Sequence, residues 1–338
     1  MRKLLLATMA CCLMGTLAAQ DPNFSQFFVS PLSLNPALTG KFNGDFRIAG
    51  NYRDQWPAIS KAFITSTVSF DLPVYRNDLD TWGVGVIGMT DKTANGILST
   101  NSIAVTTAYH KGIDPDGLHQ IGLGFQGTYN TKRLDGTDLH FETELDQYGG
   151  WSLNSGEPVD GRQINLSYFD LSVGALYNGS SDGYNNYYLG VSGYHLNKPK
   201  ESFDDNVFYT LSPRITVHAG GSFAIGGDNT RNIYISSLYS RQAGASNIVV
   251  GGAAGFNLNQ DEENPTNFYA GLWTRFNNVS DALIPYVGLE FGSFRLGASY
   301  DVNISTLKTA SQSRGGIEVS LIFIRRPPGS KGIPCPRF

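Results

Sequence analysis

The sequence predicts an all-β protein, a transmembrane antiparallel up-and-down β-barrel of about 14 strands that follows a cleaved signal peptide. A short apolar leader opens the chain, and apolar and polar residues then alternate with a period of two along most of it. Such alternation indicates strands with one apolar and one polar face. Many of the apolar faces begin or end in an aromatic residue, which is typical of strands that cross both interfaces of a bilayer.

Residues 1–19 have the layout of a secretory signal peptide. Arg2 and Lys3 give a positive start, residues 4–17 are largely apolar, and small residues precede an expected cleavage near Ala19. The apolar stretch is too short for a membrane-spanning helix. We therefore expect an exported protein.

Cleavage would remove two of the three cysteines and two basic residues. Only Cys335 would remain, so the mature chain could not close an internal disulfide. Lipidation of Cys11 is disfavoured, because the residues before it lack the apolar side chain that a lipoprotein signal needs. The basic residues would fall from 25 to 23 against 29 acidic ones, which moves the formal charge from −4 to −6 and argues against a nucleic-acid partner.

Residues 20–44 form an N-terminal segment that strand periodicity does not explain. Pro22, Pro31 and Pro36 bar a regular strand, yet the segment carries several Phe and Leu residues that would not remain in water. We expect the segment to pack against the periplasmic rim of the barrel or to enter its lumen.

Residues 45–326 are predicted to form the barrel itself. Most segments are about ten residues long, which is the length that a tilted strand needs to cross a bilayer. Clear alternation marks 46–53, 62–71, 102–110, 120–129, 214–223, 268–276 and 294–302, and weaker alternation marks 82–90, 169–177, 187–195, 232–240, 247–258, 283–292 and 316–325. A soluble β-sandwich also alternates, but it uses fewer and shorter strands, and the small polar faces here suit a lumen better than a dry core.

Connection lengths suggest an orientation. If both termini are periplasmic, the longest connections, residues 131–167 and 196–212, face outside, and tight turns such as 292–293 face the periplasm. Residues 327–338 would form a periplasmic basic tail. We expect machinery on the periplasmic side to meet the N-terminal segment and basic residues near the C-terminus, namely Arg325, Arg326, Lys331 and Arg337.

No pattern in the chain indicates catalysis or a cofactor. The five histidines lack metal-ligand spacing, and none lies near a Gly-x-Ser-x-Gly turn. Glu142, Glu144 and Asp146 are not spaced as in a calcium-binding loop, and a solvated acidic loop is the simpler interpretation. Arginines that alternate toward the lumen should form an internal salt-bridge network with lumen carboxylates; the arginines are Arg47, Arg53, Arg214, Arg275 and Arg295, and the carboxylates are Asp71, Glu290, Asp301 and Glu318.

Three stretches carry a family resemblance. The DPxFSQ start (21–26), the PLxLNPAxxG run (31–40) and the YRDQW corner (52–56) resemble the PorP/SprF family of Bacteroidetes outer-membrane proteins, as does the last strand with its basic tail. The matching motif residues are Pro31, Asn35, Pro36, Gly40, Tyr52, Arg53, Gln55 and Trp56. Phe27, Phe28 and Leu38 depart from the tyrosine, methionine and tyrosine that are usual there, so the resemblance does not extend to cargo identity.

The resemblance covers the mature chain and implies a 14-stranded barrel in the bacterial outer membrane that is associated with the type IX secretion system. Such barrels assist secretion or surface retention of an adhesin-like cargo protein with a C-terminal sorting domain, and some serve gliding motility. The implied partners are this cargo, other components of the secretion system and outer-membrane lipid. The family provides no catalytic residues.

Two other functions stay open, an outer-membrane porin or small-molecule transporter and, more distantly, an outer-membrane hydrolase. A porin needs an open lumen, whereas the first hypothesis predicts a filled one. Exposed aromatics among acidic residues and glycines in the two long connections are the candidate anchors for a protein partner. These are Phe141, Tyr148, Trp151, Phe203 and Phe208.

Overall fold

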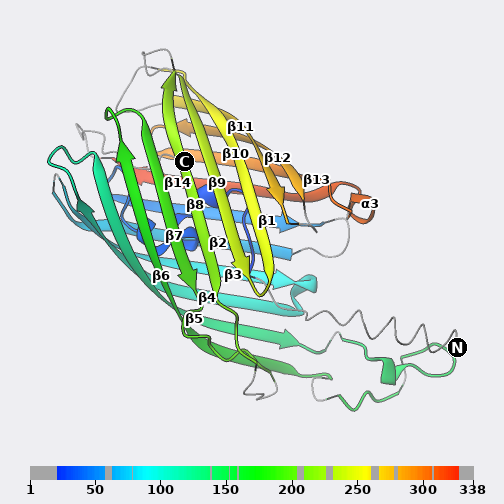
Figure 1. Ribbon diagram of the computed structural model, residues 1–338. Helices are drawn as coiled ribbons and strands as arrows, with labels where there is room; N and C mark the ends of the chain where they lie inside the picture. Colours follow the sequence, from blue (N-terminus) through cyan, green and yellow to red (C-terminus); the bar gives the residue numbers. More distant parts are fainter. Residues whose placement is uncertain are drawn as a thin grey trace, which may run out of the picture.

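The computed structural model describes residues 21–57, 63–77, 79–137, 139–151, 153–157, 160–203, 209–225, 231–259, 266–277, 281–306 and 308–326. In these residues 14 β-strands close into one barrel, in which β14 pairs with β1 (Figure 1). Every strand pair is antiparallel, and apart from the closing β1–β14 pair, neighbours in the barrel are neighbours in sequence. The predicted fold class is confirmed. The expected signal peptide (1–19) and basic tail (327–338) lie outside the described residues.

The barrel strands are 9 to 18 residues long. They are β1 (Phe46–Gln55), β2 (Phe63–Arg76), β3 (Thr81–Thr93), β4 (Leu98–Gly112), β5 (His119–Asp135), β6 (Gln163–Ser180), β7 (Asn186–Tyr194), β8 (Arg214–Ile225), β9 (Arg231–Gln242), β10 (Ala245–Asn257), β11 (Thr266–Phe276), β12 (Ala282–Phe291), β13 (Phe294–Asn303) and β14 (Arg314–Arg325). The helical turns are η1 (Phe27–Val29), α2 (Pro31–Leu34), η2 (Pro36–Leu38), η3 (Ala94–Gly96), η4 (Glu142–Glu144) and α3 (Lys308–Ser311). None of the helices in the described part of the chain is long and apolar enough to span a membrane.

Side chains alternate between the outer surface and the lumen as the sequence predicts. On β4, Val105 is 65% exposed on the outer surface, whereas the next residue, Thr106, is 1% exposed inside. Aromatic side chains bound the apolar outer band on this side of the barrel, with Trp82 and Tyr109 toward one end and Tyr129 toward the other. This is the pattern of a wall with lipid outside and a polar interior.

The two ends of the barrel differ. We name the end at which β1 begins and β14 ends the terminal rim, and the opposite end the far rim. The β5–β6 connection (136–162) and the β7–β8 connection (195–213) lie at the far rim, and the β5–β6 hairpin projects beyond the other strands there (Figure 1).

The long connection predicted at 131–167 is shorter than expected, which corrects the sequence prediction. Residues 131–135 of β5 pair with residues 163–167 of β6 in regular register. The outward side chains of this extension are polar, among them Arg133 and Asn165. Its apolar side chains, among them Ile164 and Leu166, lie on the inward face, whereas Phe169 and Leu171 in the apolar band of the same strand face outward. The alternation therefore changes phase at this point, and the sequence reads as a break in the strand.

The interior of the barrel is occupied by residues 21–45, which we name the lumen segment. It begins near the far rim, where Asp21 lies beside Gln242 at the end of β9, and reaches the terminal rim, where the amide of Asp45 donates to the carbonyl of Arg325 (2.8 Å). Leu32 and Asn35 within it are fully buried. Figure 1 shows this segment as blue coils enclosed by the strands.

Candidate functional site

The lumen segment approaches the wall most closely at glycines. A Cβ added at Gly174 on β6 would overlap Oδ1 of Asn35, and one added at Gly124 on β5 would overlap the backbone between Pro36 and Ala37. A Cβ on Gly83 of β3 would come within about 2.6 Å of the Cα of Gly40. The backbone of residues 35–40 therefore lies in a track that only glycine leaves open. Sequence reasoning missed this track, because a glycine on a lumen face does not reveal what it faces.

Asn35 fastens the middle of the lumen segment to this track. Its Oδ1 accepts the amide of Ala37 (2.8 Å), which caps the η2 turn. Its Nδ2 donates to the carbonyls of Ala175 (3.1 Å) and Val191 (3.3 Å) and lies 3.0 Å from Nε2 of His218. One amide side chain thus connects the segment to β6, β7 and β8. In this chain, Asn35 of the family motif therefore holds the lumen segment against the wall.

Arg53, the arginine of the YRDQW corner, occupies the centre of a buried ionic cluster near the far rim. Its guanidinium lies 2.7 Å from Asp301 and 2.9 Å from Glu318, and Arg275 lies 2.7 Å from the same Asp301 oxygen. The lumen segment closes the cluster, since the amide of Ser25 donates to Glu318 (2.7 Å) and its hydroxyl donates to Asp301 (2.8 Å). Burying this many charges is tolerated because each has a partner.

The predicted salt-bridge network is confirmed for four of its five arginines. Besides Arg53 and Arg275, Arg47 pairs with Asp71 (2.8 Å) and Arg295 with Glu290 (3.0 Å). Arg214 departs from the prediction, because it pairs with Asp21 of the lumen segment (3.1 Å) rather than with a wall carboxylate. Entry of the segment into the lumen brings this additional acid within reach.

The remaining motif residues begin turns or make local contacts in the wall. Pro31 and Pro36 open the α2 and η2 turns, where a missing amide hydrogen is harmless. Tyr52 faces outward, and Gln55 accepts a hydrogen bond from Arg53 (3.3 Å). Trp56 adopts a positive φ and packs edge-on against Phe63, with ring centroids 5.5 Å apart.

Two of the basic residues that were expected to meet periplasmic machinery lie in the described part of the chain, and they differ in their exposure to solvent. Arg326 is engaged inside the terminal rim, where it lies 2.7 Å from Glu290. Arg325 remains largely exposed beside Asp45 (3.7 Å). Lys331 and Arg337 fall outside the described residues.

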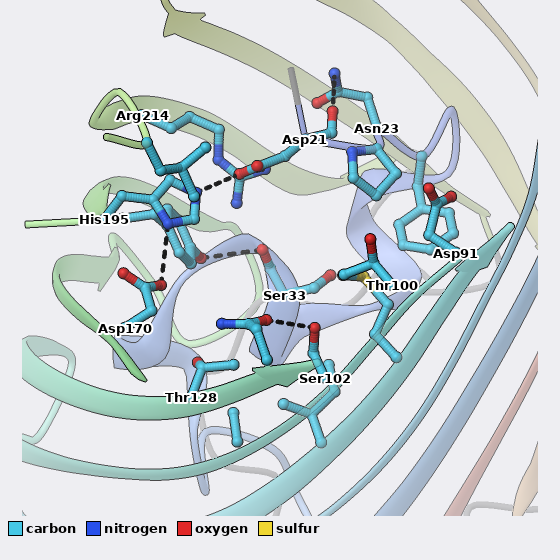
Figure 2. A pocket seen from close by; sticks show the side chains of 18 of the residues that line it. Asp21, Asn23, Ser33, Asp91, Thr100, Ser102, Thr128, Asp170, His195 and Arg214 are labelled. Atoms are coloured by element: carbon cyan, nitrogen blue, oxygen red, sulfur yellow. Dashed lines mark hydrogen bonds and ion pairs between the residues drawn. The ribbon is translucent and has the colours of Figure 1, made fainter. Parts of the chain in front are cut away.

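A cavity of about 340 Å³ lies between the lumen segment and the wall at the far rim (Figure 2). At one side, His195 lies 2.8 Å from Asp21 and 3.1 Å from Asp170, and Arg214 lies 3.1 Å from the same Asp21 oxygen that His195 contacts. Burial disfavours the protonated imidazole, but Asp170 and Asp21 outweigh burial and raise the pKa of His195 to about 9. Burial likewise opposes the charged form of Asp21, but Arg214 and His195 prevail and lower its pKa. We name Asp21, Asp170, His195 and Arg214 the far-rim latch.

The candidate partner residues lie at the far rim on a small loop of defined structure. In the β5–β6 connection Tyr148 is 88% exposed and Trp151 is 54% exposed. Trp151 stacks on His140 (centroids 5.1 Å apart) and bridges to Leu145, which braces the loop from within. Phe141 is half-buried at the start of η4.

The other residues considered in these connections play smaller parts. Phe203, in the β7–β8 connection, is half-buried, and Phe208 lies outside the described residues. The acidic residues of the β5–β6 loop serve its own fold, since Glu144 accepts from His140 (3.0 Å) and Asp146 accepts the amides of Tyr148 and Gly150.

Comparison with known proteins adds a family match. A family model described as "Type IX secretion system membrane protein PorP/SprF" matches residues 16–323. No curated protein matches the sequence.

Several solved outer-membrane barrels are similar to this chain, with low sequence identity and low TM-scores. The ferric enterobactin receptor of Pseudomonas aeruginosa aligns with 11% identity and a TM-score of 0.35 over 76% of this chain, which spans only 44% of the receptor. A FadL homologue from Pseudomonas aeruginosa has 10% identity and a TM-score of 0.43, with 87% of this chain and 94% of the other covered. BamA from Haemophilus ducreyi has 11% identity and a TM-score of 0.43, with 84% and 71% covered. These similarities do not bear on function.

Proposed function

Because the chain belongs to the PorP/SprF family of type IX secretion system membrane proteins, we propose that this outer-membrane barrel supports secretion or surface retention of one adhesin-like cargo protein. The cargo would carry a C-terminal sorting domain, and gliding motility would depend on the barrel through that cargo. Other components of the secretion system are further partners. The proposal assigns no catalysis to the chain.

The observation that supports this proposal most is the combination of a filled lumen with a braced, exposed loop. The lumen segment is held along its length, at the far-rim latch, at Ser25, at Asn35 and at the terminal rim by Asp45. A porin or small-molecule transporter, the alternative function, needs an aqueous path through the barrel, and this segment occupies that path.

The partner surface that we propose is the β5–β6 loop. Exposed aromatic anchors in polar surroundings supply most of the binding energy in protein interfaces. Tyr148 and Trp151 meet that description, and the internal contacts of Trp151 hold it in place before binding, which lowers the entropic cost of association. We place the far rim outside the cell, so this loop would meet cargo at the surface.

The test is removal of the loop without disturbing the barrel. The amide of Gly136 donates to the carbonyl of Arg162 (2.8 Å), so the hairpin ends already meet and a short Gly-Ser link can replace residues 139–157. A double variant, Tyr148→Ala with Trp151→Ala, tests the anchors in an intact loop. Tyr184→Ala, an exposed tyrosine at the terminal rim, is the matched control.

We expect all three proteins to remain heat-modifiable barrels on gels. Surface cargo, measured by protease accessibility on whole cells, should fall several-fold in the loop replacement and in the double variant, and stay unchanged in the control. Full cargo retention in both loop variants would contradict the outer-face proposal.

A further inference from the structure

The far-rim cavity has no part in the proposed cargo contact, and its walls have a distinct chemistry. On β4 its lining runs from Leu98 to Ala104, which at about 3.3 Å per residue makes a slot roughly 20 Å deep along the strand. Its volume of about 340 Å³ is within the range of small-ligand pockets, roughly 300–1,000 Å³.

The charges around the cavity disfavour an anionic ligand. Its three basic groups are neutralised, Arg214 by Asp21 (3.1 Å), His195 by Asp170 (3.1 Å) and Lys132 by Glu201. A fourth lining carboxylate, Asp91, accepts the hydroxyl of Thr65 (2.6 Å) and forms no ion pair with a described residue. The lining therefore carries one excess negative charge, which suits a neutral ligand or one bearing an amine.

The wall on β4 and β5 presents neutral groups that both donate and accept hydrogen bonds. These lining residues are Thr100, Ser102, Gln126, Thr128 and Asn130. Gln126 is only 8% exposed; its Nε2 donates to the hydroxyl of Thr128 (3.2 Å), whereas its Oε1 has no hydrogen-bond partner among the described residues. An unpaired buried carbonyl oxygen costs free energy, so a ligand hydroxyl that reached it would be favoured.

The lumen segment contributes an apolar patch to the cavity, beside its polar residues Asp21, Asn23 and Ser33. The patch consists of Pro22, Phe24, Phe27 and Leu34, which line the same cavity as the hydroxyl and amide groups of the wall. A sugar ring has the same division, with hydroxyls at its edge and C–H groups on its faces. Such a ring could therefore satisfy both kinds of group in the slot at once.

We propose that the far-rim cavity binds a neutral or amine-bearing mono- or disaccharide that enters from the far rim. The wall hydroxyls and Gln126 hold the ligand hydroxyls, the lumen segment covers the ring face, and Asp91 holds an amine where one is present. This site is independent of the proposed cargo loop.

The experiment is isothermal titration of the purified, detergent-solubilised barrel with a fixed panel. The panel is maltose, cellobiose, N-acetylglucosamine and glucosamine, with galacturonic acid as the anionic contrast. Ser102→Phe fills the slot, Ser237→Phe adds the same ring on the outer surface of β9, and Asp91→Asn removes the unpaired carboxylate. Gel heat-modifiability confirms that each variant is folded, and Thr100→Phe replaces Ser102→Phe if the latter does not fold.

We expect saturable binding of at least one neutral or amine-bearing sugar and weaker binding of galacturonic acid. Filling the slot should weaken binding at least tenfold, Ser237→Phe should leave it unchanged, and Asp91→Asn should reduce any preference for glucosamine over the neutral sugars. The proposal is overturned if no panel sugar binds saturably, if the filled slot binds equally well, or if galacturonic acid binds best.

Discussion

Replacing Gly174 with alanine tests whether the lumen segment is locked into its glycine track. Alanine is ordinarily the better residue within a strand, by about 0.5–1 kcal/mol. At Gly174, however, the new Cβ would overlap Oδ1 of Asn35, and it would lie about 3.2 Å from the amide nitrogen of Ala37. The amide group of Asn35 must then move, together with the part of the lumen segment that it holds.

The size of the effect follows from the contacts of Asn35. Its side chain takes part in four hydrogen bonds, with Ala37, Ala175, Val191 and His218. Losing about half of them at roughly 0.5–1.5 kcal/mol each, with some overpacking strain, gives a cost of about 2–4 kcal/mol. Asn35→Ala should cost at least as much, because it removes all four hydrogen bonds.

A double-mutant cycle separates this clash from a general effect of alanine. The free energy of unfolding is measured by urea titration of the barrel in lipid vesicles, for wild type, both single variants and the double variant. In the Asn35→Ala background the overlapping atom is gone, so Gly174→Ala should add little, and the coupling energy should be about 2–4 kcal/mol, the cost of Gly174→Ala alone. Gly88→Ala is the control, because a Cβ there approaches nothing closer than about 4.0 Å.

Two results would refute the claim that Asn35 holds the lumen segment against Gly174. One is a Gly174→Ala barrel as stable as wild type. The other is simple additivity of the two substitutions, which would mean that Asn35 and Gly174 do not meet in the folded barrel.

Two further predictions concern the wall and the far-rim latch. Leu123→Arg, on the lipid-facing side of β5, should cost about 2–4 kcal/mol in the same titration, whereas Thr100→Arg, facing the far-rim cavity, should cost much less; equal costs would show that the assigned faces are wrong. Because the pKa of His195 is raised from 6.5 to about 9, its contribution to stability is fully present below pH 6.5 and is lost as the pH rises through 9. The difference in stability between wild type and His195→Gln should therefore shrink over that range, and a difference independent of pH would exclude the charged latch.

The wall of the barrel could be predicted because the pattern that forms a strand involves residues that are close in sequence. Residues such as Ile103 and Val105 alternate with small polar neighbours, and the period of two follows from strand geometry alone. The arginines on lumen faces also indicated an ionic interior, since buried charges need partners. Both features can be read from residues a few positions apart.

The interior arrangement could not be predicted, because it depends on contacts between distant segments. Asn35 meets residues more than 130 positions away, and Gly124 and Gly174 look like ordinary strand glycines until the lumen segment lies against them. The pairing of Asp21 with Arg214 and the cavity beside it have the same origin. The apolar alternation of β6 also changes phase where the β5–β6 hairpin leaves the apolar band, since Ile164 and Leu166 face inward there, so the extension did not continue the pattern of the wall.

Single-channel recording in planar bilayers tests most directly the claim that the lumen segment closes this barrel. Purified wild-type protein should show little steady current, and a variant lacking residues 21–44 that remains heat-modifiable on gels should show large open steps. Porin-sized steps from the wild-type barrel would contradict the account and favour a diffusion channel.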